Sequence, residues 1–139
     1  VFVDYFKKLK LKDAVVVSPD VGGIKMARAY AKRLNAGLAI VDKRRISPES
    51  TEVVHILGEI KGMNAIIVDD IVATGSSLVE AVEILSKKGA KEVWAAVSHG
   101  VLSGSALERI DKCKSLRELL ISDSIPLSNH EKYPRVKVL

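Results

Sequence analysis

The sequence predicts an α/β fold with three layers, in which a mostly parallel β-sheet is flanked by helices on both faces. Short apolar runs recur along the chain, at residues 14–17, 38–41, 65–68 and 93–97. Because these runs lack polar alternation, they indicate strands that are buried on both faces. Segments with helical spacing separate most of them, as expected when helical crossovers join parallel strands.

The helices are predicted from apolar residues that recur at intervals of three and four. In residues 24–34, apolar side chains take one side of the helix and Lys or Arg side chains take the other, which is typical of a helix docked on a sheet. The predicted helices comprise residues 1–11 and 24–34, a segment with a stripe of Leu78, Val82 and Leu85 that ends at Gly89, and residues 105–112.

The remaining strands are shorter or less regular. Residues 52–61 are rich in β-branched residues and are interrupted by Gly58, so we expect an extra strand that leads to a turn at Gly62. His55 falls within this strand, and we interpret it as a structural residue. Two further strands are predicted at residues 116–121 and 135–139.

The length and composition fit a single domain that covers residues 1–139. The chain has 139 residues, of which 47% are hydrophobic, and its mean hydropathy is +0.16. No apolar run approaches the roughly 20 residues that a membrane-spanning helix needs, and charged residues occur too early for a secretion signal. We therefore expect a cytoplasmic protein that has no membrane partner. The single cysteine, Cys113, excludes an internal disulfide and is assigned no role.

The chain is basic, with 22 Lys and Arg residues against 17 Asp and Glu residues, a net charge of +5 and a pI near 9.4. Such a charge suits either a nucleic acid or a small polyphosphate. Most of the basic residues are scattered over predicted helix faces, and aromatic residues that could stack on bases are not interleaved with them. This distribution makes nucleic acid an unlikely partner and favours a phosphorylated small molecule.

The most informative motif is the apolar strand that runs into Asp69 and Asp70 and then into a turn of small residues before a helix. Backbone N–H groups of such a turn can surround a phosphate, and the N-terminus of the following helix adds partial positive charge. The carboxylates can accept hydrogen bonds from sugar hydroxyls or meet a metal ion. The turn consists of Ala73, Thr74, Gly75, Ser76 and Ser77. An ordinary strand end with a capped helix is the alternative interpretation.

A second anion-binding turn is predicted where the first strand meets residues 18–23. Pro19 stops the strand, while Gly22 and Gly23 allow the backbone to approach a ligand closely. This turn could hold the pyrophosphate part of a substrate, with Asp20 reaching a Mg²⁺ ion that bridges phosphate oxygens. An ordinary strand–helix turn with Asp20 as its cap is an equally good interpretation of these residues.

The second strand is followed by a dense basic run, from Asp42 to Arg45. If the chain stays extended there, Lys43 and Arg45 project to one side and Arg44 projects to the other. A positioned Lys or Arg can stabilise the charge that develops on phosphoryl oxygens during transfer. A solvated basic surface is the alternative, and the expected place of the run at the same sheet edge as the other two motifs argues against it.

Taken in order, these three motifs resemble those of the ribose-phosphate pyrophosphokinase family, within the phosphoribosyltransferase fold superfamily. The segment from Ser98 to Gly104 is also similar to that family. The resemblance covers nearly the whole chain and corresponds to the C-terminal half of a family member. It implies a phosphoribosyltransferase-like fold and an enzyme that transfers pyrophosphate from ATP to C1 of ribose 5-phosphate.

The resemblance also implies roles for individual residues. Lys43 and Arg45 would be catalytic, and Asp20 would bind Mg²⁺ and form the pyrophosphate or ATP loop with Gly22 and Gly23. The ribose 5-phosphate site would consist of Arg45, Asp69, Asp70, Ala73, Thr74, Gly75, Ser76 and Ser77. The expected partners are ribose 5-phosphate, ATP, an N-terminal ATP-binding half and further copies of the chain. The first residue is Val1, so we expect a fragment of a two-domain protein, whose exposed apolar edge would favour association.

Some features depart from the family pattern or leave alternatives open. Many members have Asp where this chain has Ala73, and others often have His in place of Val21. His99 is predicted at a strand end near the substrate, without a partner that would orient it. A phosphoribosyltransferase that consumes phosphoribosyl pyrophosphate is one alternative, although no base-binding hood is evident. A non-catalytic regulatory subunit is another, although the intact Lys43, Arg45 and Asp20 argue against it.

Overall fold

A computed structural model describes residues 1–45, 52–125 and 130–139. Its centre is a seven-stranded sheet in the order β3-β2-β1-β4-β5-β6-β7, in which every neighbouring pair is parallel except β2 and β3. The strands are β1 (Ala14–Ser18), β2 (Gly37–Arg45), β3 (Glu52–Leu57), β4 (Asn64–Val72), β5 (Glu92–Gly100), β6 (Leu116–Ile121) and β7 (Val136–Val138). The α-helices are α1 (Phe2–Leu9), α2 (Ile24–Leu34), α3 (Ser76–Lys87) and α4 (Ala106–Asp111). Two short 3₁₀ segments, η1 (Val21–Gly23) and η2 (His130–Lys132), complete the described elements.

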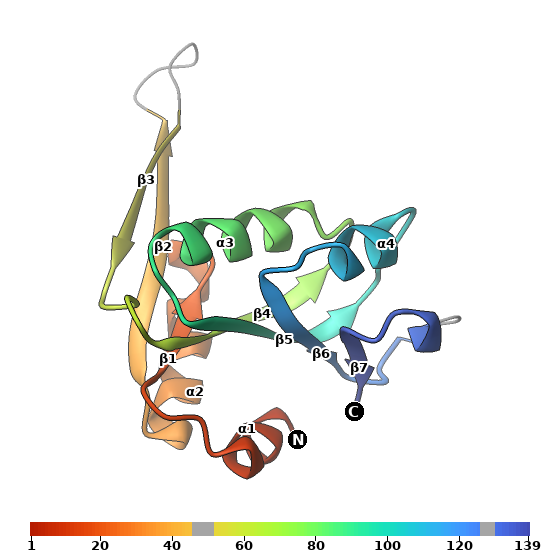
Figure 1. Cartoon of the computed structure of the whole chain (residues 1–139), viewed down its shortest axis with the longest axis horizontal. Coiled ribbons are helices and arrows are strands. Elements are labelled where there is room, and N and C mark those ends of the chain that lie inside the picture. The colour runs from red at the N-terminus through yellow and green to blue at the C-terminus, as the bar shows by residue number, and fades with distance from the viewer. Residues whose placement is uncertain (46–51, 126–129) are drawn as a thin grey trace.

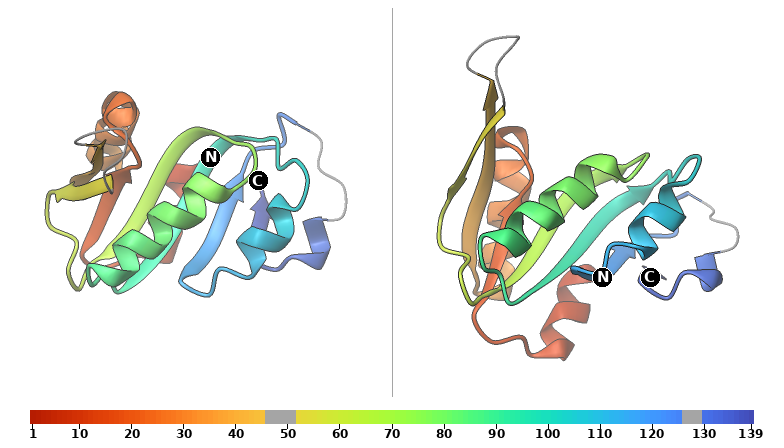
Figure 2. Two further views of the ribbon diagram at one scale, coloured as in Figure 1. Left: turned by 90° about the horizontal axis from the view of Figure 1, so that it is seen from above. Right: turned by 45° about the horizontal axis from the view of Figure 1, so that its top comes forward.

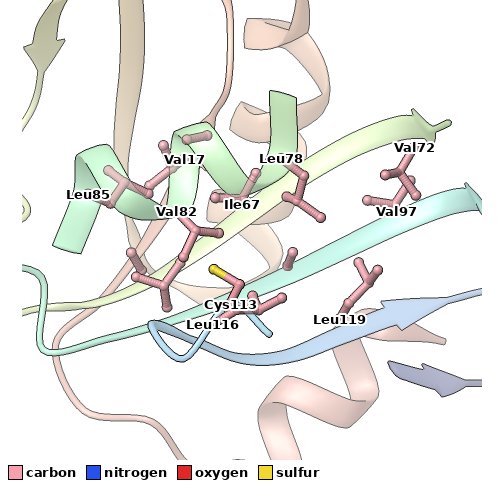
Figure 3. Packing of buried hydrophobic residues seen from close by; sticks show 14 of the residues in the cluster. Val17, Ile67, Val72, Leu78, Val82, Leu85, Val97, Cys113, Leu116 and Leu119 are labelled. Atoms are coloured by element: carbon pink, nitrogen blue, oxygen red, sulfur yellow. The ribbon is translucent and has the colours of Figure 1, made fainter. Parts of the chain in front are cut away.

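The three predicted layers are confirmed, with α3 and α4 on one face of the sheet and α1 and α2 on the other (Figure 2). Successive strand residues alternate between the two faces, so Ile67 packs on the α3 side while Ile66 and Val68 pack on the α2 side. Both cores consist of residues that are almost fully excluded from solvent. Figure 3 shows how Leu78, Val82 and Leu85 of α3 meet the sheet in one of these cores.

The strand order of the sheet reverses direction at β1, which pairs with β2 on one side and with β4 on the other. From this point the chain order runs outward in both directions, and open α/β sheets bind ligands at the carboxyl ends of the strands beside such a switch. The pairing of β1 with β4 ends at Val17 and Ile67, whereas β4 stays paired with β5 as far as Val72 and Gly100. The prediction that the strand ends at Asp69 and Asp70 was therefore wrong, because β4 continues past both residues to Val72, where it is still paired with β5.

The basic run after the second strand also lies within a strand. β2 continues through Arg45 and forms an antiparallel hairpin with β3, in which Lys43 lies opposite Val54 and Arg45 lies opposite Glu52. This hairpin extends beyond the rest of the sheet (Figure 1). The extended course that we expected is confirmed, although the predicted strand end at residue 41 was too early. The run stays extended despite its charged side chains because its backbone pairs with that of β3.

The other predicted elements are present with small differences at their ends. The helix at residues 24–34 and the strand at residues 116–121 have the predicted bounds, and the extra strand before Gly62 is β3. His55 lies within β3, as expected, and its side chain is exposed. Among the helices of residues 1–45, 52–125 and 130–139, none is both long enough and apolar enough to cross a bilayer.

Candidate functional site

A cavity of about 370 Å³ lies at the carboxyl ends of the strands, beside the switch between β1 and β4. Three chain segments supply its polar side chains: the turn after β1, the middle of β2, and the end of β4 with the loop that follows. Its lining residues are Pro19, Asp20, Lys43, Ile67, Asp69, Ile71, Val72, Ala73, Thr74, Gly75, Ser77, Leu78 and Val97. The structure therefore brings together residues from all three predicted motifs.

The segment of residues 73–77, called the 73–77 loop, joins β4 to α3, includes the first two residues of that helix and forms one wall of this cavity. Gly75 has a φ of 81°, in the left-handed region, and precedes the first residue of α3. Ala73, Thr74, Gly75 and Ser77 line the cavity. Ser76 does not, and its hydroxyl lies 3.3 Å from the Oγ1 of Thr74. A loop of small residues at the N-terminus of a three-turn helix is suited to an anion.

The two carboxylates after the apolar run lie in different environments. Asp69 is partly buried and lines the cavity, whereas Asp70 is exposed and does not. The pKa of Asp69 is raised to about 6, chiefly by burial, with smaller contributions from the charges of Asp70 and Asp20, while the N–H of Asp70, which donates to Asp69 Oδ1 at 2.8 Å, acts in the opposite direction. Asp69 is thus the carboxylate that can meet a ligand inside the cavity.

Asp20 combines a structural contact with a place in the cavity wall. Its Oδ1 accepts a hydrogen bond from the N–H of Gly23 at 2.9 Å, so Asp20 caps the N-terminus of η1, as the alternative interpretation expected. Gly22 and Gly23 do not line the cavity. A Cβ atom at Gly23 would lie 2.8 Å from the Oγ of the buried Ser18, which explains this glycine by close packing.

Lys43 lines the cavity from β2 and forms an ion pair with a residue of α3 that does not line it. Its Nζ lies 3.2 Å from Glu80 Oε1 on α3, and the two side chains are 25% and 52% exposed. The local sequence gave no signal for Glu80, because the pair joins a strand to a helix that is 37 positions away in the chain. The side chain of Arg45 lies outside the described part of the structure.

His99 has an orienting partner that we did not expect. Its Nδ1 lies 2.8 Å from the Oγ of Ser124, beyond the end of β6, and Ser124 Oγ also donates to the carbonyl of Ser98 at 3.2 Å. The prediction that His99 lacks a partner was therefore wrong, because the chain returns after β6 to the edge where β5 ends. His99 is not among the residues that line the cavity.

A second hollow, of about 500 Å³, lies at the opposite edge of the sheet, where β5 and β6 begin. Its lining includes Lys91, Glu92, Lys114 and Arg135. Arg135 already donates from Nε to the carbonyl of Leu116 and from Nη1 to the carbonyl of Asp111. This hollow lies at the C-terminal end of α3, beside Ser86 and Ala90, so it lacks the helix N-terminus and the loop of small residues that the cavity at the carboxyl ends offers to an anion.

Within the three described ranges, no group of three or more His, Cys, Asp or Glu side chains converges as a metal site. The cavity nevertheless contains two carboxylates, Asp20 and Asp69, whose charges influence each other. Mg²⁺ usually takes one or two protein carboxylates and completes its shell with substrate phosphates and water. These residues fit a metal ion that arrives together with a phosphorylated substrate.

Comparison with known proteins agrees with this geometry. Residues 2–128 match the model of the phosphoribosyl transferase domain family. A ribose-phosphate pyrophosphokinase from Clostridium acetobutylicum is 48% identical over 91% of this chain and 40% of its own length. The crystal structure of phosphoribosylpyrophosphate synthetase from Mycobacterium smegmatis has a TM-score of 0.88 at 33% identity, over 99% of this chain and 44% of that one.

A more distant structure shares the fold. The adenine phosphoribosyltransferase of Giardia lamblia, solved with 9-deazaadenine, has a TM-score of 0.64 at 20% identity, over 83% of this chain and 72% of that one. The chain spans about two fifths of the length of the curated relatives it matches. The sequence resemblance and the predicted fold class are thus confirmed. The extent and strength of these matches establish that the chain belongs to the phosphoribosyl transferase domain family.

Proposed function

We propose that this chain is the ribose-5-phosphate-binding half of a ribose-phosphate diphosphokinase. The reaction transfers pyrophosphate from ATP to C1 of ribose 5-phosphate and yields phosphoribosyl pyrophosphate and AMP. The observation that carries the proposal is the shared cavity of Asp20, Lys43, Asp69 and the 73–77 loop. The names of the relatives agree with it, since curated proteins similar to this chain are ribose-phosphate pyrophosphokinases.

The sugar phosphate would occupy the part of the cavity beside the 73–77 loop. Backbone N–H groups and hydroxyls of this loop would hold its phosphate, and the Asp69 carboxylate would accept hydrogen bonds from ribose hydroxyls. Asp70 and Ser76 were predicted for the same site but do not line the cavity of the ligand-free chain. A contact between either residue and the sugar would require a rearrangement on binding.

Transfer would proceed by attack of the C1 oxygen on the β-phosphorus of ATP. The new O–P bond forms as the bond between the β-phosphorus and the oxygen that leaves with AMP breaks, and the C1 hydroxyl releases its proton to solvent water. Lys43, with Arg45 on the same strand, would neutralise the charge on the transferring group. Alignment and charge neutralisation account for most of this chemistry, so a dedicated general base is not required.

Mg²⁺ is part of the proposal as a cofactor that arrives with the nucleotide. Asp20 would bind it directly, and the carboxylate of Asp69, which lies close enough to Asp20 for their charges to interact, would also attract the cation. The ion supplies charge neutralisation to the phosphates of ATP. Gly22 and Gly23 would help Asp20 by shaping the turn rather than by lining the site.

The partners extend beyond the small molecules. An N-terminal half that binds ATP and further copies of the chain are proposed, because relatives of this chain are more than twice its length. The predicted cytoplasmic location belongs to the same proposal. A phosphoribosyltransferase would use the same loop in the reverse sense, with phosphoribosyl pyrophosphate as donor to a base, and a regulatory subunit would bind without reaction.

Calorimetric titration with ribose 5-phosphate tests the proposed binding site. We expect saturable binding by the parent chain, and a loss of at least about tenfold in Asp69→Ala and in the double variant Ser76→Ala/Ser77→Ala. Asp4→Ala is a matched control, because Asp4 is an exposed carboxylate on α1. Absence of heat with millimolar ligand, for a chain shown to be folded, would contradict the proposal.

A second measurement distinguishes the candidate reactions. The chain is incubated with Mg-ATP and ribose 5-phosphate, alone and with the N-terminal half of a similar ribose-phosphate pyrophosphokinase, and AMP is followed. Formation of AMP that depends on both substrates supports the diphosphokinase. Release of pyrophosphate from phosphoribosyl pyrophosphate and a purine base, without AMP formation in the first assay, would instead favour the phosphoribosyltransferase. Binding without either reaction, in both preparations, would favour the regulatory subunit.

A further inference from the structure

We infer that Arg109 is a positioning residue that holds the 73–77 loop in its anion-binding conformation. Arg109 lies on α4, outside every predicted motif. Its Nη1 donates to the carbonyl of Thr74 at 2.5 Å, and its Nη2 lies 3.4 Å from the Oγ of Ser105. The guanidinium is therefore anchored to its own helix while it bonds the centre of the loop.

Three carbonyl groups of this part of the chain accept hydrogen bonds from the residues that follow β5. The carbonyl of Val72 accepts from the N–H groups of Val101 and Leu102, at 3.0 and 3.3 Å, and the carbonyl of Ala73 accepts from Ser103 at 3.0 Å. The carbonyl of Thr74 is bonded by Arg109. Three successive carbonyls are thus held by one neighbouring segment. Carbonyl oxygens carry partial negative charge, so holding them away from the cavity removes repulsion toward a phosphate.

Packing on the same side leaves the loop little freedom. A Cβ atom at Gly75 would lie 3.1 Å from Cγ1 and 3.2 Å from Cδ1 of Ile110, the residue that follows Arg109. Ala106 and Ile110 are fully buried. The loop therefore packs against α4. The partly buried Arg109 lies at the edge of this packing and adds a hydrogen bond to it.

Arg109 also adds a permanent positive charge next to the loop. A guanidinium remains protonated at any pH at which the protein is folded and donates in a fixed planar geometry. Lysine would keep the charge but could not reproduce the two-armed contact with Thr74 and Ser105. The inference rests on the proposed function only for the identity of the ligand, a sugar phosphate; the positioning of the loop rests on the contacts above.

Arg109→Met and Arg109→Lys test the inference, with Arg28→Met as a matched control at an exposed arginine on α2, on the other face of the sheet. Amide hydrogen exchange is measured without ligand for residues 101–103, whose N–H groups donate to the carbonyls of Val72 and Ala73, and for the core residues 15–17. Inorganic phosphate and ribose 5-phosphate are then titrated separately. We expect faster exchange at residues 101–103 but not in the core in Arg109→Met, and about tenfold weaker binding of both ligands, with Arg109→Lys between this variant and the parent.

Parent-like exchange at residues 101–103 and unchanged affinities in Arg109→Met would overturn the inference, and so would equal acceleration at these residues and in the core, which would indicate general destabilisation. If Arg109→Met loosens the loop and weakens phosphate binding while the parent does not prefer ribose 5-phosphate to phosphate, the inference stands and the proposed function fails. If the parent binds ribose 5-phosphate tightly and Arg109→Met does so equally, the inference alone fails.

Discussion

Lys43, which lines the cavity, forms an ion pair with Glu80 of α3, with 3.2 Å between Nζ and Oε1. Glu80 is therefore bonded to the ammonium group of Lys43 that the proposed reaction would use. A phosphate that binds next to Lys43 must compete with this carboxylate or share the lysine with it. The pair is partly exposed, so its net contribution to stability is at most about 1 kcal/mol and the competition is mild.

Replacement of Glu80 by Gln should therefore strengthen the binding of inorganic pyrophosphate by about two- to fivefold, because it removes a competing negative charge. Calorimetry at two salt concentrations measures the effect, which should shrink at the higher concentration. Glu83→Gln, on the same helix, controls for the general loss of a negative charge. An equal gain in both variants would show that the ion pair itself has no role.

Asp69 should make the stability of the folded chain fall as the pH rises from about 4 to 6. Its pKa is raised to about 6 in the folded state, above the ordinary value of 3.8, so the folded chain holds this proton more tightly than the unfolded chain. At pH 7, Asp69→Asn should raise the free energy of unfolding by about 1 kcal/mol, since partial exposure reduces the full effect of the shift.

Thermal or urea unfolding of the parent and Asp69→Asn between pH 3.5 and 8 provides the measurement. The difference between the two proteins should become small toward pH 3.5, where the carboxyl group is mostly protonated in both states. A parent chain that gains stability relative to Asp69→Asn as the pH rises would contradict the raised pKa.

Gly75→Ala should destabilise the chain more than Gly62→Ala. Both glycines have positive φ, 81° and 74°, so the conformational cost is similar at the two positions. Only at Gly75 would the added Cβ atom press on Ile110, whereas nothing lies within 4 Å at Gly62. We expect a difference of about 1–3 kcal/mol in the free energy of urea-induced unfolding. Equal losses in the two variants would mean that α4 moves away easily.

Cys113 should be unreactive in the native chain. The thiol is buried, and burial together with the neighbouring Glu83 raises its pKa, which lowers the fraction of reactive thiolate at pH 8. Labelling with a thiol reagent should be at least about 100-fold slower than in urea, because it requires local opening. Rapid labelling without urea would indicate that α4 separates readily from α3.

The sequence predicted the features that depend on local pattern. The amphipathic spacing of Ile24 to Leu34 determines which side of α2 is buried, and the apolar runs mark the interiors of the strands, because each depends on neighbours a few residues away. The ends of β2 and β4 were misplaced, since their polar ends are stabilised by pairing with β3 and β5, which a single segment cannot reveal.

The same distinction separates the predicted from the missed parts of the site. Asp20, Lys43, Asp69 and most of the 73–77 loop could be found because their motifs are contiguous. Glu80, Ser124 and Arg109 were missed, since each acts on a residue at least 25 positions away and belongs to an ordinary-looking segment. Their contacts are a consequence of the sheet order, which brings distant segments to one edge.

The unequal pairing of β4 has an evolutionary consequence. Beyond Ile67 this strand keeps β5 as its partner and loses β1, so the 73–77 loop is built on β5 and α4, while Lys43 stands on the separate β2–β3 hairpin. Mutations in the hairpin can therefore accumulate without disturbing the loop. A lineage could exchange the chemistry performed at one side of the cavity and inherit the anion-binding side unchanged.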